Sequence, residues 1–123
     1  MTARPDSLAP CPGSPNCVSS LASDETHRIE PFVIRGSVAK SMETLRAIID
    51  SMPRSTIKIA NEDYLQAKFV TLIFRFPDDL ELLADPESGV IHVRSAARLG
   101  YSDLGVNRRR VEKIRSKFQA AFE

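Results

Sequence analysis

Residues 56–96, with the sequence TIKIANEDYLQAKFVTLIFRFPDDLELLADPESGVIHVRSA, decide the fold of this chain. Apolar and β-branched runs alternate there with clusters of Asn, Asp, Pro and Gly, which is typical of antiparallel strands joined by turns. We predict four strands, over residues 56–60, 64–76, 80–84 and 90–96. Residues 61–63 are predicted to form a turn, residues 77–79 to break the second strand, and residues 85–89 to form a hairpin turn in which Gly89 suits a left-handed position.

The alternation of side chains along a strand predicts which residues share a face. In the first of these strands Ile57 and Ile59 are expected on the same face. In the last strand the apolar residues 91 and 93 lie on one face, and His92 and Arg94 lie on the other. If the apolar face packs against helices, His92 and Arg94 project from the opposite side of the sheet.

Two helices flank this β-rich stretch. Ser37 is a good N-cap for the first, because its hydroxyl can accept from the unpaired amides of the first turn. Pro53 ends that helix, whose apolar stripe consists of Val38, Met42, Leu45, Ile49 and Met52. The second helix is predicted over residues 107–122, with an inward face of Val111, Ile114, Phe118, Ala121 and Phe122.

A short strand over residues 32–35 completes the order β-α-β-β-β-β-α for a single domain of residues 32–123. This order predicts an α+β two-layer sandwich, an antiparallel sheet with both helices on one face. It resembles the TATA-binding-protein-like arrangement, a likeness that concerns the fold alone. Residues 1–31 hold five of the eight prolines and are expected to form an irregular arm. The face of the sheet away from the helices must be open, paired with another molecule, or covered by this arm.

The composition is that of an ordinary globular protein, with 42% hydrophobic and 27% charged residues. No apolar run reaches the ~18 residues of a spanning helix, so we expect a cytoplasmic protein, or an exported or membrane-attached one if the chain is truncated. There is no Gly-rich phosphate loop, Gly-x-Ser-x-Gly elbow or His-Glu-x-x-His pair. We expect no metal, cofactor, nucleic-acid or membrane partner.

Positive charge is concentrated near the C-terminus. The net charge is +1, but residues 94–123 contain eight basic and three acidic residues. Three consecutive arginines at a helix start oppose the helix dipole, and a bound anion would relieve that repulsion. The predicted ligand-binding residues, for a small anionic molecule or a protein carboxylate, are Arg94, Ser95, Arg98, Tyr101, Ser102, Asp103, Asn107, Arg108 and Arg110. Alternatively, Asp103 or Asn107 caps the helix and Asp103 pairs with an arginine.

Cys11 and Cys17 lie in the segment CPGSPNC of the arm. Their spacing permits a disulfide, and in a reducing compartment they would be free thiols. A thiol-dependent enzyme or redox protein would use Cys11 or Cys17 with His27 as the base. A zinc site of both cysteines, His27 and His92 is arithmetically possible, but the spacing matches no familiar zinc pattern.

The segments CPGSPNCVSS, from residue 11, and RSAARLGYSDLGVNRRRVEKIR, from residue 94, with His27 and Pro31 between them, resemble the domain of unknown function 1499 family. The resemblance extends from about Ala9 to Phe122 and implies no agreed activity, although some similar bacterial and photosynthetic proteins carry export or membrane segments. Ala97 stands where Ser is more usual. The matching positions include Cys11, Pro12, Ser14, Pro15, Asn16, Cys17, Arg94, Ser95, Arg98, Gly100, Tyr101, Ser102, Asp103, Gly105, Asn107 and Arg110.

Three functions follow as hypotheses. The first is a small binding module in which the arm folds against residues 94–110 and the arginines hold an anion. The second is the thiol enzyme or redox protein. The third is a structural interaction domain, in which the arginines pair internally and the two motifs lock the arm to the domain.

Overall fold

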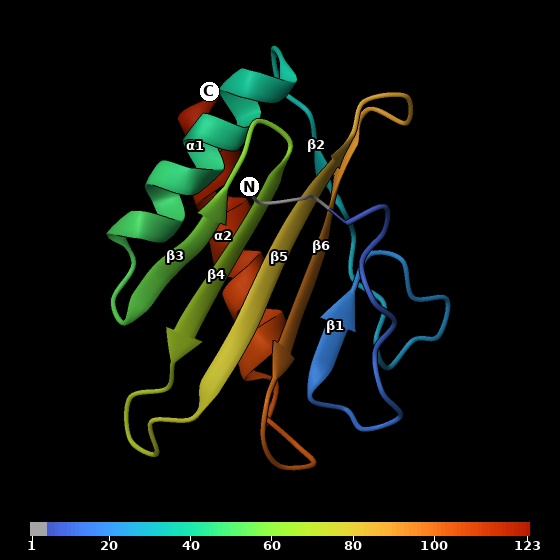
Figure 1. The fold of residues 1–123 in the computed structure, drawn as a ribbon, viewed down its shortest axis with the longest axis vertical. Coiled ribbons are helices and arrows are strands. Elements are labelled where there is room, and N and C mark those ends of the chain that lie inside the picture. Colours follow the sequence, from blue (N-terminus) through green and yellow to red (C-terminus); the bar gives the residue numbers. More distant parts are fainter. Residues whose placement is uncertain (1–4) are drawn as a thin grey trace.

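The computed structural model describes residues 5–123, so residues 1–4 of the predicted arm lie outside the described part (Figure 1). Its elements follow the predicted order, with one further strand ahead of them. They are β1 (Cys17–Ser19), β2 (Phe32–Val33), α1 (Val38–Ser51), β3 (Ser55–Ala60), β4 (Tyr64–Val70), β5 (Pro77–Asp85), β6 (Val90–Ala97) and α2 (Val106–Ala121).

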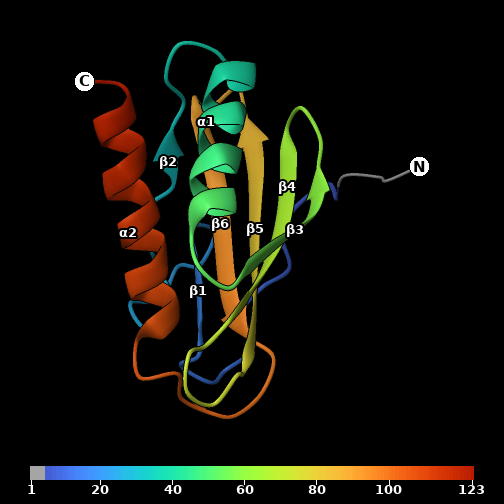
Figure 2. The same ribbon diagram turned by 90° about the vertical axis from the view of Figure 1, so that its left-hand side faces the viewer.

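The strands form one antiparallel sheet in the order β1-β6-β5-β4-β3, and β2 also pairs with β6. Both helices pack on the same face of this sheet, which confirms the predicted α+β two-layer arrangement (Figure 2). Neither described helix is long and apolar enough to cross a membrane.

The main core lies between the helices and the sheet. The Ser37 hydroxyl accepts from the Lys40 amide at 3.0 Å and begins α1 as predicted. The Phe118 ring of α2 packs edge-on against Phe32, with 5.8 Å between ring centroids. The most completely buried apolar side chains come from both layers: Phe32, Leu45, Ile49, Leu80, Leu82, Ile91, Val93, Val111 and Ile114.

The predicted strand over residues 64–76 is too long. β4 ends at Val70, and a turn follows in which the Thr71 amide donates to the Phe76 carbonyl at 3.0 Å. The Thr71 hydroxyl accepts from the Phe76 amide at 2.8 Å, so the turn closes on itself. Pro77 then begins β5 instead of breaking the chain, because the first residue of a strand tolerates a missing N–H.

The prediction that Ile57 and Ile59 share a face is wrong. The register between β3 and β4 shifts between these residues, and such a bulge reverses the alternation of side chains. Ile57 packs against the main core, whereas Ile59 packs on the opposite face of the sheet. There it joins a second cluster of Leu8, Tyr64 and Leu83.

The arm is not irregular throughout. Cys17–Ser19 forms β1 and pairs with β6, placing Cys17 opposite Ala96. Leu8 of the arm is buried against the side of the sheet that faces away from the helices. The arm therefore extends the sheet at one edge and covers part of its second face, which is one of the three states that the sequence left open for that face.

Candidate functional site

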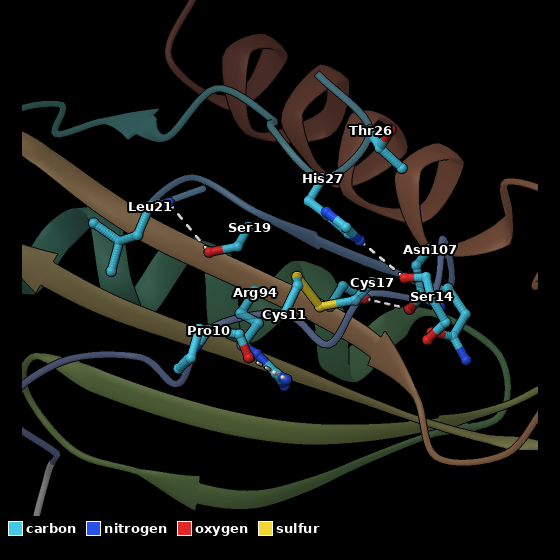
Figure 3. Close-up of a disulfide and its surroundings, with 12 residues drawn as sticks. Pro10, Cys11, Ser14, Cys17, Ser19, Leu21, Thr26, His27, Arg94 and Asn107 are labelled. Carbon is cyan, nitrogen blue, oxygen red and sulfur yellow. Dashed lines mark hydrogen bonds between the residues drawn. A yellow bond between two sulfur atoms is a disulfide. The ribbon is translucent and has the colours of Figure 1, made fainter. Parts of the chain in front are cut away.

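Cys11 and Cys17 form a disulfide, with their Cα atoms 5.7 Å apart (Figure 3). The spacing alone had allowed either free thiols or a disulfide, and in this structure neither sulfur is a thiol. Both cysteines are consequently unavailable as zinc ligands beside His27 and His92. No group of three metal-binding side chains gathers anywhere in residues 5–123.

His27 fixes two points of the arm to each other. Its Nε2 lies 2.9 Å from the Ser14 carbonyl oxygen, and its Nδ1 lies 2.6 Å from Asp24 Oδ2. The Ser14 carbonyl and then the Asp24 carboxylate raise the pKa of His27 against the opposing effect of burial. Because both ring nitrogens face acceptors, the protonated ring is favoured and has no lone pair for a general base. Figure 3 shows the ring directed at Ser14.

The arm contacts the arginine-rich segment directly. The Ala97 amide donates to the Asn16 carbonyl at 2.9 Å, which continues the β1–β6 ladder by one bond. The Asn16 side-chain amide donates to the Gly100 carbonyl at 2.8 Å. Asn16 is buried, so these bonds hold the start of the loop at residues 98–105 against the arm.

Two predicted ligand-binding arginines pair with carboxylates of the chain itself. Arg98 donates to both oxygens of Asp79, each at 2.8 Å. Arg110 Nη2 lies 2.9 Å from Asp78 Oδ2, and both side chains are almost fully buried. Burial lowers the pKa of Arg110 and raises that of Asp78, although their mutual attraction acts against both shifts. The Arg110 guanidinium also lies over the Phe69 ring, 4.6 Å from its centroid.

Two other arginines donate to backbone carbonyls of the arm. Arg108 bonds the carbonyl oxygens of Arg28 and Thr26, at 2.9 and 3.1 Å. Arg94 bonds the Pro10 carbonyl at 3.3 Å, and its buried Nε has no hydrogen-bond partner. These guanidiniums attach the arm to β6 and α2 through carbonyl oxygens, so their charge is not neutralised by a carboxylate.

Asp103 takes the place at the start of α2 that an external anion was predicted to fill. Its carboxylate accepts from the amides of Gly105 and Asn107, at 2.8 and 3.1 Å. Burial opposes ionisation, but the Asn107 side chain and these amides lower the pKa of Asp103 overall. The predicted alternative holds in one part: Gly105 is the N-cap residue, and Asp103 just ahead of it accepts from amides at the helix start, but within residues 5–123 Asp103 forms no ion pair with an arginine.

Asn107 connects this cap to the core. Its side-chain amide donates to Asp103 at 2.8 Å, and its Oδ1 accepts from the Ser95 hydroxyl at 2.6 Å. Arg110 Nη1 donates to the same Oδ1 at 2.9 Å. Asn107 and Ser95 are fully buried, so both act within the fold.

The remaining predicted residues, Tyr101 and Ser102, do not join the arginines. Tyr101 is 72% exposed. Ser102 accepts from the Leu104 amide at 3.2 Å within its own loop. The structure therefore brings together the arm and the arginine segment, but it does not converge the nine predicted side chains on one pocket.

Sequence reasoning missed a cluster of apolar side chains at one end of the molecule, which we call the apolar end. It comes from the loop at residues 71–76 and the loop at residues 98–105, which lie together below the sheet in both ribbon views (Figures 1 and 2). The two loops line a mainly apolar hollow of about 400 Å³. Its exposed lining residues are Leu72, Ile73, Phe74, Phe76, Leu99 and Leu104, and Tyr101 of the second loop is exposed as well without lining the hollow.

Backbone strain is concentrated at the same end. Among residues 5–123, the non-glycine residues with positive φ are Arg54, Arg75 and Leu104, at 59°, 58° and 55°. Arg75 and Leu104 lie in the two loops, and Arg54 Nε donates to the Val70 carbonyl at the base of the first loop at 3.1 Å. Left-handed backbone at such residues costs free energy, and residues of this kind cluster at functional segments.

The family model described as protein of unknown function, DUF1499, matches residues 7–118. The chain belongs to this family. The match covers the disulfide, the arginine segment and both loops of the apolar end, so this whole arrangement lies within the DUF1499 domain. No curated protein matches the chain.

Proposed function

We propose that this DUF1499 domain is a small binding module whose working surface is the apolar end. One observation carries the proposal: six large apolar side chains from two loops are exposed around one hollow, and Tyr101 is exposed beside them. Exposed apolar patches on soluble domains commonly mark interaction sites, because leaving such surface in water costs free energy.

The two sequence motifs support this surface from behind. Arg98 pairs with Asp79, and Asn16 holds Gly100, at the start of the second loop. Arg109 Nη1 donates to the Leu104 carbonyl at 2.9 Å at the end of that loop. The arm and the arginine segment thus act as a lock that positions Leu99, Tyr101 and Leu104. A preorganised surface loses less conformational entropy on binding.

The larger hollow beside α1 is a weaker candidate for the same role. It measures about 640 Å³ and lies between α1 and the β3–β4 turn. Its lining includes Glu43, Arg46 and Glu62, and polar surface is as extensive there as apolar surface. A ligand that binds there instead of at the apolar end would be recognised by which residues it perturbs.

Titration with dodecylphosphocholine below its micelle concentration, followed by amide NMR shifts, tests the proposal. We expect shifts at residues 71–76 and 98–105, which weaken in Ile73→Ser and Leu104→Ser. Val33, which is 61% exposed on β2, supplies the matched control Val33→Ser. Shifts centred on the hollow beside α1, or equal weakening by Val33→Ser, would show that the apolar end is not the binding surface.

A small-anion site at the arginines remains a second hypothesis, favoured by one observation. The buried Arg94 Nε has no acceptor, and a bound oxyanion would provide one. Millimolar phosphate or acetate should then raise the thermal midpoint of the wild type. The rise should be smaller in Arg94→Gln and in Arg98→Ala. An unchanged midpoint in the wild type would exclude it.

The disulfide also bears on location. Disulfides persist in oxidising compartments and are rare in the cytosol. The Cys11–Cys17 pair therefore supports an exported location over the cytoplasmic one expected from composition. Mass spectrometry of the chain from its native source, alkylated before reduction, would detect the pair as two unmodified cysteines.

A further inference from the structure

Positive charge without a carboxylate partner surrounds the apolar end. Arg75 is an exposed member of the first loop, and its guanidinium has no acceptor within residues 5–123. Arg109 and Arg54 are also exposed. Each donates to a backbone carbonyl of these loops or their base, Leu104 and Val70, and so keeps its full charge.

The acidic residues of the same segments are already occupied. Asp79 accepts both bonds from Arg98, and Asp78 is buried beside Arg110. Asp103 accepts from the first amides of α2. Since Asp79 and Asp78 neutralise Arg98 and Arg110, the charges left at this end are Arg54, Arg75 and Arg109 against Asp103. The rim of the apolar end is therefore positive, and it favours a partner that carries negative charge.

The shape of this end suits a flat partner. Both loops lie at the same end of the long axis of the molecule, so one plane can touch both (Figure 1). The side chains at their tips are the most exposed apolar ones: Leu104 at 82%, Ile73 at 79%, Phe74 at 72% and Tyr101 at 72%. Aliphatic and aromatic side chains with arginines behind them are the combination that binds bilayer interfaces.

We propose that the apolar end binds the surface of a lipid bilayer containing anionic lipids. The loop tips enter the boundary between headgroups and acyl chains, and Arg54, Arg75 and Arg109 contact lipid phosphates. This inference rests on the proposed function, because it names the partner of the same surface. It replaces the expectation of no membrane partner, which considered only spanning segments.

The charges also decide against a second copy of the chain as the occupant. A symmetric dimer through this end would place the same three arginines of two molecules around one interface. Like charges facing each other at an interface are unfavourable, whereas lipid phosphates neutralise them. The strained backbone at Arg75 and Leu104 fits loops that are kept in shape for a partner.

Co-sedimentation of the full, disulfide-intact chain with lipid vesicles tests this. One set contains phosphatidylcholine alone, and the other contains equal parts of phosphatidylcholine and phosphatidylglycerol. We expect binding to the anionic vesicles that falls at least tenfold in Ile73→Ser and Leu104→Ser and weakens with added salt. Arg75→Gln should weaken it severalfold, while Val33→Ser and Lys117→Gln, at exposed positions elsewhere, should bind like the wild type.

The contrary outcomes separate this inference from the proposed function. If dodecylphosphocholine maps to the apolar end but no vesicle is bound, the lipid proposal is wrong while the proposed binding surface stands. Equal binding to neutral and anionic vesicles would also overturn it, since the arginines would then contribute nothing. A dimer that Ile73→Ser dissociates would identify a second copy as the occupant. If the amphiphile does not map to the apolar end, the proposed function itself fails.

Discussion

Leu104 combines two unfavourable features, and their removal should stabilise the domain. Its side chain is 82% exposed and its φ is 55°, in the left-handed region. For a residue with a branched side chain this backbone costs about 1–2 kcal/mol, and Asn adopts it more readily. Because the Leu104 side chain is almost fully in water, replacing it loses little burial. We therefore expect Leu104→Asn to raise the free energy of unfolding by about 1 kcal/mol.

For a domain of this size that gain corresponds to a rise of about 4 °C in the thermal midpoint. The contact from Arg109 survives, because it uses the Leu104 carbonyl and not the side chain. Differential scanning calorimetry of the disulfide-intact chain measures the shift. Leu99→Asn is the matched control, since Leu99 is also exposed, at 57%, but has an ordinary φ.

The reasoning fails if Leu104→Asn is neutral or destabilising, or if Leu99→Asn stabilises equally. Either result would mean that the left-handed backbone at residue 104 is not strained. The same variant should bind vesicles less well, because it removes the most exposed apolar side chain of the surface. Gain of stability with loss of binding is the usual relation at a functional segment.

Three further predictions concern the lock behind the apolar end. Replacing Cys11 and Cys17 together by Ala should lower the free energy of unfolding by about 2 kcal/mol, because the disulfide no longer restricts the unfolded chain over this short loop. Urea denaturation measures the loss. An unchanged free energy of unfolding would mean that the arm is held by its other contacts alone. Asn107→Ala should lower the free energy of unfolding by about 3 kcal/mol, because it leaves the buried Ser95 hydroxyl and one bond to Asp103 without a partner. Adding Ser95→Ala to this variant should then lower it little further. A large additional loss in the double variant would contradict the network. The pKa of His27 is raised in the folded state, so its contribution is complete below about pH 6.5 and is lost as the pH rises through the folded pKa. Thermal midpoints at about pH 5.5 and about pH 8.5 should therefore differ more for the wild type than for His27→Gln, and equal pH dependence would refute the interaction.

Much of the fold was determined by local sequence. The Ser37 cap, the apolar stripe that follows it and the turn at Gly89 are short-range features, and the structure has each where it was predicted. The split of His92 and Arg94 from their apolar neighbours follows from strand alternation in the same way. Such features depend on a few adjacent residues, so no knowledge of distant partners was needed.

Tertiary structure decided where the strands end and on which face of the sheet the residues beside the β3 bulge lie. The apolar run at residues 72–76 has the composition of a strand, but the Thr71–Phe76 turn removes it from the ladder. A single shift of register beside Lys58 separates Ile57 from Ile59. Both outcomes depend on pairing across strands, which composition does not encode.

The roles of the arginines were also decided by tertiary structure. Charge counting located the cationic segment, but Asp78, Asp79 and the carbonyls of the arm approach from distant parts of the chain. By itself the sequence determined that cations and a Cys-Pro arm were present in an α+β domain. Only the folded chain determined that they bind each other, because a guanidinium bonds whichever acceptors the backbone brings within reach. The same contacts hold the loops of the exposed apolar end in place.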